Sequence, residues 1–168
     1  ICFKLFTMSI DNMYKGPDLN KTSKDIYENE SGERIKRLKE RLSKLTGQEN
    51  LDNIDPEKLL LKTIEFYNNL FHTNFPDDNF EISLDKNKTD NLFTLKLNRE
   101  PNEIFEEIKN QDNRDNKSQY INQQRKMRLI GTLLLDFEPT TDPLTITKQI
   151  LDIIERFLQK ESSDNISK

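Results

Sequence analysis

Positive charge is concentrated in one short segment of the chain, between positions 33 and 44. The segment holds six Lys and Arg residues but only two acids, Glu33 and Glu40. Clustered cations of this kind attract phosphate backbones, anionic membrane surfaces or the acidic face of another protein. The six basic residues are Arg34, Lys36, Arg37, Lys39, Arg41 and Lys44.

Apolar residues in the same segment follow the period of a helix. Four of them are separated by three, four and three positions, so they line one stripe of an α-helix. Gly47 follows and can end the helix. We therefore predict a basic amphipathic helix over 32–46. The stripe consists of Ile35, Leu38, Leu42 and Leu45.

This helix has two alternative roles. Its stripe can pack on the chain's own core and leave the charges in solvent. Alternatively, stripe and charges together bind a partner, which can be an acidic protein, a nucleic acid or a membrane surface. The residues that we predict for partner docking are Arg34, Ile35, Arg37, Leu38, Arg41, Leu42, Lys44 and Leu45.

The side chains that most enzymes use are scarce. His72 is the only histidine, and no Gly-x-Ser-x-Gly sequence presents a serine nucleophile. Nucleophilic catalysis needs a nucleophile, a base and a group that orients the base. We therefore predict no catalytic residues, and we expect His72 to lie at a helix end near the last carbonyl groups.

Phosphate and metal sites also lack their usual signals. The four glycines stand far apart, whereas phosphate loops need several together. Cys2 is the only cysteine, which excludes an internal disulfide and a cysteine-based zinc site. Asp112 and Asp115 stand among asparagines, as in a calcium loop, but the required glycine is missing and Arg114 intervenes. We expect no metal site and no cofactor.

Composition sets the size of the core and the chain's surroundings. The 168 residues include 18 Asn but no Ala, Val or Trp, as expected of an A/T-rich genome. Only 33% are hydrophobic, which is close to the limit for ordering a chain. The net charge of −4 argues against general attraction to nucleic acid, and no apolar run reaches the roughly 20 residues of a membrane span. We expect an intracellular protein, cytoplasmic or nuclear.

The apolar residues predict one domain between two tails. We place a single α+β domain at 31–160 and disordered tails at 1–30 and 161–168. The apolar start lacks a small-residue cleavage site, and Met8 follows it. We therefore expect Met8 to be the natural first residue and residues 1–7 to be non-native.

Helix starts and alternating runs predict the elements of this domain. Asp55-Pro56 and Asp142-Pro143 combine a capping acid with a proline suited to the first helical turn. Apolar and polar residues alternate over 80–85 and 92–98, across a short polar segment, which predicts a β-hairpin. The predicted helices are 32–46, 56–73, 102–110 and 143–160.

A third strand completes the predicted sheet. Residues 127–137 form a nearly continuous apolar run, which predicts a strand buried on both faces; a buried helix is the alternative. Gly131 and Pro139 favour the strand. The polar residues 110–124 before it predict an exposed loop. The fold class is therefore α+β, with a small antiparallel three-stranded sheet and helices packed mainly on one of its faces.

These features favour a non-catalytic interaction subunit or adaptor of a larger assembly, docking through helix 31–46. Its partner is another protein with an acidic or apolar groove, or a second copy of the chain. A nucleic-acid-binding accessory protein is the alternative, with Arg125, Lys126 and Arg128 as a second basic cluster. An enzyme without a recognisable motif is the third hypothesis.

Overall fold

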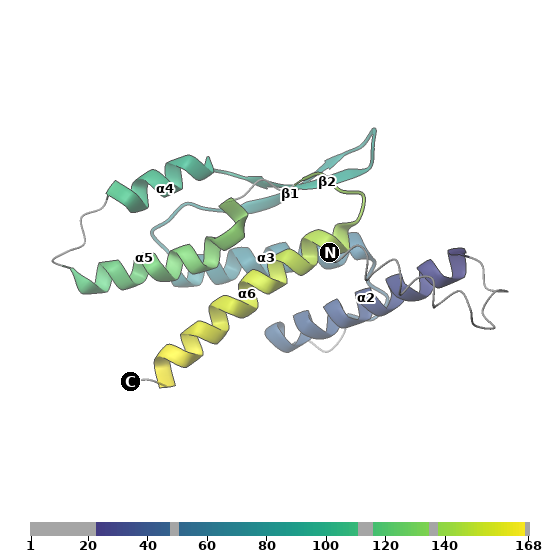
Figure 1. Ribbon diagram of the computed structural model, residues 1–168, viewed down its shortest axis with the longest axis horizontal. Helices are drawn as coiled ribbons and strands as arrows, with labels where there is room; N and C mark the ends of the chain where they lie inside the picture. The colour runs from purple at the N-terminus through teal and green to yellow at the C-terminus, as the bar shows by residue number, and fades with distance from the viewer. Residues whose placement is uncertain (1–22, 48–50, 111–115, 135–137, 167–168) are drawn as a thin grey trace, which may run out of the picture. The chain divides into compact units, whose positions relative to one another are not determined.

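The computed structural model describes residues 23–47, 51–110, 116–134 and 138–166. Over these residues the fold is α+β, with five α-helices and a two-stranded antiparallel sheet (Figure 1). A single 3-10 turn, η2 (Gly131–Leu134), follows the fourth of these helices. In chain order the elements are α2 (Ser23–Thr46), α3 (Pro56–Asn74), β1 (Ile82–Asn87), β2 (Leu92–Leu97), α4 (Pro101–Asn110), α5 (Lys117–Ile130), η2 and α6 (Pro143–Ile166).

The chain divides into two compact units, Ile1–Arg37 and Leu38–Lys168. The division falls inside α2, which is one continuous helix of 24 residues. The predicted helix at 32–46 is confirmed, but it begins earlier. Residues 23–30, which we expected in the N-terminal tail, are helical.

The core of the second unit is built around α3. The Asp55 side chain accepts a hydrogen bond from the backbone N–H of Lys58 at 2.8 Å, and Pro56 occupies the first turn. The helix therefore begins where the sequence predicts. α3 packs against α6. Its buried residues are Leu59, Leu60, Thr63, Ile64, Tyr67 and Phe71.

The predicted hairpin is present, and one face of it is buried. Ile82 pairs with Leu97 across the two strands, and β1 extends two residues closer to the turn than predicted. Ile82 and Phe93 are only 2% and 6% exposed, and both belong to the same hydrophobic cluster as Ile64 of α3. Because α3 contacts β1 and α6 contacts β2, the two helices lie against the hairpin's apolar face (Figure 1).

The predicted third strand at 127–137 is wrong over the part that the structure describes. Residues 127–130 form the last turn of α5 and 131–134 form η2, while 135–137 lie outside the described residues. Gly131, which we took to favour a strand, is the C-cap of α5. Its φ is +45°, a value that glycine adopts without the steric penalty of other residues.

The described residues 127–134 are apolar for another reason than burial on both faces of a strand. Leu129 and Ile130 enter the core from the end of α5, and Leu133 enters it from η2. A helix end followed by a tight turn thus buries consecutive apolar residues. The hairpin gains one further antiparallel bridge, between Phe93 and Thr140.

The loop predicted at 110–124 is helical over most of the residues that the structure describes, although residues 116–122 and 124 are exposed as expected. Asn116 caps α5 by accepting a hydrogen bond from the backbone N–H of Gln119 at 3.0 Å, so the residues from Lys117 onward are helical. Residues 111–115 lie outside the described part of the chain. At the other end of the protein, α6 continues to Ile166, so residues 161–166 are helical and not a tail.

Candidate functional site

The apolar stripe predicted for docking is divided between the two units. Leu38 and Leu42 belong to the unit with the core and are 5% and 1% exposed. Leu45 is partly buried and packs against the same core cluster. These three leucines therefore already have an internal packing partner. Ile35 belongs to the other unit and is half-buried.

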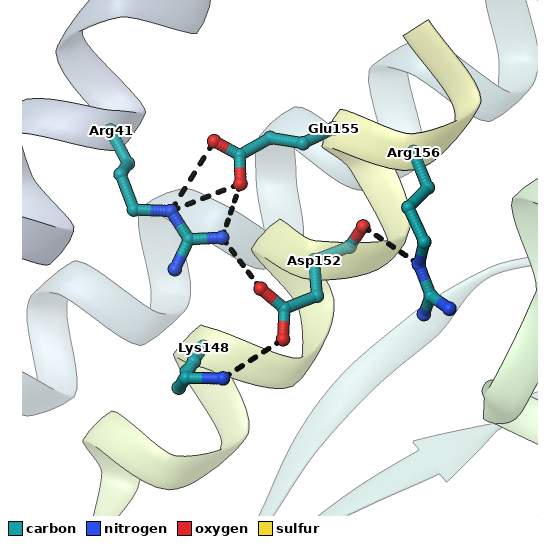
Figure 2. Close-up of polar contacts among 5 residues, drawn as sticks. All are labelled: Arg41, Lys148, Asp152, Glu155 and Arg156. Atoms are coloured by element: carbon teal, nitrogen blue, oxygen red, sulfur yellow. Dashed lines mark hydrogen bonds and ion pairs between the residues drawn. The ribbon is translucent and has the colours of Figure 1, made fainter. Parts of the chain in front are cut away.

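Arg41 forms a two-acid ion pair with α6. Its Nη2 donates to Asp152 Oδ1 at 2.7 Å, and its Nε donates to Glu155 Oε1 at 3.0 Å (Figure 2). Nη2 also donates to Glu155 Oε1. On the other side of Asp152, Lys148 donates to Oδ2 at 3.1 Å. The guanidinium thus links the end of α2 to α6 by contacts that span more than 110 positions in the sequence.

These contacts change the pKa values of Arg41 and Asp152 in the stabilising direction. The hydrogen bond to Glu155 raises the pKa of Arg41, although burial acts against it. Burial by itself raises the pKa of Asp152, but hydrogen bonds from Arg41 and Lys148 lower it overall. Both groups therefore stay charged near neutral pH, and Arg41 is engaged within the chain.

Other basic residues of α2 remain on the surface. Lys36, Arg37 and Lys44 are exposed and form no ion pair with any residue that the structure describes. Arg34 is half-buried. Of the eight predicted docking residues, the structure leaves Arg37 and Lys44 the most accessible.

The second basic cluster predicted from the sequence is neutralised by acids. Lys126 pairs with Asp78 at 2.7 Å. Arg125 pairs with Glu161 of α6, and its guanidinium lies 5.3 Å from the ring centre of Phe75. Arg128 Nη2 lies 3.7 Å from Asp164 Oδ2. The three cations are therefore parts of the packing between α5, α6 and the end of α3.

His72 lies in the last turn of α3, the helix end that we predicted for it. Its Nε2 is 3.3 Å from Glu81 Oε1, and both side chains are exposed. The partner is thus a carboxylate just before β1 and not a helix carbonyl. Among the described residues, the hydrogen-bond partner of the ring is this carboxylate and not a hydroxyl or thiol group.

Sequence reasoning missed an arrangement at the outer edge of β1. The Asn68 side chain accepts a hydrogen bond from the Ile82 N–H at 3.0 Å and donates one to the Ile82 carbonyl at 2.9 Å. One amide therefore satisfies both backbone groups of a strand edge. No spacing in the sequence marks Asn68 for this role, because its partner lies on another element.

A groove between α5 and α6 was also missed. Its volume is about 790 Å³, and Asn74 is among the residues that line it. Ile121 lines it from α5 and is 48% exposed, beside Tyr120 at 53%. The ion pairs of Arg125 and Arg128 cross it, so its charges are balanced internally.

Within the described ranges, no three His, Cys, Asp or Glu side chains gather where a metal ion would fit. The helices in those ranges include none with the length and apolar character to cross a membrane. The chain matches no known family, curated protein or solved structure.

Proposed function

We propose that this protein is a non-catalytic intracellular interaction subunit that docks on an acidic protein through the part of α2 before Leu38. The observation that carries the proposal is the division of α2. It is one helix of 24 residues, yet Ser23–Arg37 does not belong to the unit that holds the hydrophobic core.

A helical segment of this size needs a packing surface. Isolated helices shorter than about 12–15 residues are marginal in water, because most helical stability in proteins comes from burying one face. Ser23–Arg37 is a segment of this length. A partner that packs on this segment supplies the burial that an isolated helix of this length needs.

The charges that remain on α2 favour an acidic partner. Arg41 is engaged by Asp152 and Glu155 and does not contribute. Lys36 and Arg37 are exposed and place two positive charges at the C-terminal end of this segment, although Ser23–Arg37 as a whole holds four acids and four bases. Complementary charge raises the rate of association and selects the partner, whereas apolar burial supplies most of the affinity.

Charge reversal at two exposed positions tests this surface. The double variant Lys36→Glu/Arg37→Glu is expected to lose proteins that the wild-type chain retains in affinity purification with quantitative mass spectrometry. Lys109→Glu/Lys117→Glu is the matched control, because both are exposed cations outside α2 without a described ion pair and the change in net charge is the same. All three proteins should melt at the same temperature, since no core contact changes.

A second variant separates docking from folding. A chain that starts at Leu38 keeps the whole unit with the core and should fold, while losing the same proteins. Equal retention by the double variant and the control would refute the α2 surface. Retention of nucleic acid, with steep weakening by salt, would favour the alternative hypothesis instead.

A further inference from the structure

β1 has an outer edge whose hydrogen-bonding groups are only partly satisfied. Asn68 occupies the N–H and the carbonyl of Ile82 on that edge. Backbone groups alternate in direction along a strand, so the same edge carries the N–H and carbonyl of Leu84 and of Lys86. No hydrogen bond from another described element reaches these four groups.

The side chains around this edge define two different faces. Leu84 shares the helix-facing side of β1 with Ile82 and is partly buried against the core. Asp85 points to the opposite, solvent side; it is exposed and forms no ion pair with a described residue.

An exposed leucine lies on α3 beside the same edge. Asn68 and Glu57 both reach β1 from α3, the latter through its ion pair with Lys86 at 3.3 Å. Leu61 follows Glu57 by four positions and precedes Asn68 by seven, so the three residues share one helix face. Leu61 is 46% exposed and is one of three exposed large hydrophobic residues in the described part of the chain.

We propose that the outer edge of β1 at Leu84 and Lys86 is a docking site for an extended segment of another protein, which adds a third strand to the hairpin. The segment places a basic side chain opposite Asp85 and an apolar side chain over Leu61. Strand addition supplies affinity through main-chain hydrogen bonds and specificity through alternate side chains. This site lies on the hairpin and is independent of the proposed α2 surface.

Like charges and the Asn68 hydrogen bonds disfavour antiparallel pairing with a second copy of the chain. An antiparallel pair that matches Leu84 with Lys86 of the other copy places Asp85 opposite Asp85, and like charges directly opposite destabilise a sheet. A shift toward the turn places Lys86 opposite Lys86. A shift the other way requires the groups of Ile82 that Asn68 already occupies. A basic segment meets none of these obstacles.

The backbone requirement can be tested with synthetic peptides. The probe is a capped seven-residue peptide in which isoleucine alternates with lysine, and the readout is the amide NMR spectrum of the full chain. We expect shifts and slowed hydrogen exchange at Leu84 and Lys86. N-methylation of one alternate set of peptide amides should abolish these changes, whereas methylation of the other set should not, because only one edge of the peptide faces β1. No binding, or equal effects of both sets, overturns the proposal.

The charge requirement has a matched pair of variants. Asp85→Lys should weaken binding of the lysine peptide about tenfold and create binding of the peptide with glutamate in its place. Asp77→Lys is the control, because Asp77 is an exposed acid outside the hairpin without a described ion pair, and it should leave affinity unchanged. Equal binding of the glutamate peptide to the wild-type chain, or dimerisation through β1 in analytical ultracentrifugation, also overturns it.

Discussion

The end of α2 and the helix α5 both carry cations to α6, but they are held in different ways. The α2 end buries Leu38 and Leu42, and Arg41 meets its two acids at the rim of that contact. α5 buries apolar side chains mainly at its C-terminal end. Earlier in α5, Arg125 lies over the rings of Phe75 and Phe157. It also donates hydrogen bonds to Glu161, Asn122 and Asn74, so this part of α5 is held by an arginine and not by an aliphatic side chain.

This difference shows that clustered positive charge has no single meaning in this chain. Both clusters suggested a binding surface, and in both the tertiary structure provides acids from α6. The acids that pair with Arg41 lie more than 110 positions away, and the one that pairs with Arg125 lies 36 positions away. The net charge of a segment is a local property, whereas the availability of that charge depends on the fold.

The largest expected effect contrasts burial in the two regions. Leu42→Ala should lower the free energy of unfolding by about 2–5 kcal/mol, because a side chain that is 1% exposed leaves a cavity. Ile121→Ala on α5 should cost less than about 0.5 kcal/mol, since Ile121 is 48% exposed. Urea unfolding of both variants measures the contrast. Similar losses would show that the two helices are held alike.

A somewhat smaller effect is expected where α5 ends. Gly131→Ala should destabilise the protein by about 1–3 kcal/mol, because residues other than glycine rarely adopt a φ of +45°. Space is not the obstacle, since a Cβ there would lie 3.8 Å from the nearest side-chain atom of Ile153. Thermal unfolding followed by circular dichroism measures the loss. An unchanged midpoint would contradict the helix end at this residue.

Replacing Arg125 should cost more stability than replacing Arg41, because Arg125 also packs on aromatic rings. Arg125→Ala should cost about 1–3 kcal/mol, because it removes charged hydrogen bonds and contacts with the rings of Phe75 and Phe157 together. Part of this loss should persist at high salt, since salt does not screen the packing of the stem. If the wild type and the variant were equally stable in 1 M salt, Arg125 would act through its charge alone.

Arg41→Ala should have the smallest effect, about 1 kcal/mol, because its ion pairs are partly exposed. The contribution should depend on pH. The pKa of Asp152 is lowered in the folded chain, so the stabilisation is complete above about pH 4, near the ordinary Asp value, and is lost as the pH falls further. The free energies of unfolding of wild type and variant, measured from about pH 7 down to about pH 3, should converge at the acid end. A constant difference would exclude the ion pair as its source.

Local signals were sufficient wherever the cause of a structure lies within a few residues. Asp55-Pro56 and Asp142-Pro143 predicted the starts of α3 and α6, because a cap acts on the next turn of the same helix. Alternation predicted the hairpin in the same way, since neighbouring side chains of a strand point to opposite faces.

Only the tertiary structure decided the remaining features. The run at 127–137 was apolar enough for a strand or a helix end, and the core around Leu129 and Leu133 selected the helix and turn. Nothing near Arg41 in the sequence indicates its acids on α6, and nothing near Asn68 indicates the strand edge that it covers. Burial and ion pairing depend on residues distant in the sequence, so local patterns predicted the capped helices and the hairpin, while the fold determined the conformation of 117–134 and which surfaces remain available.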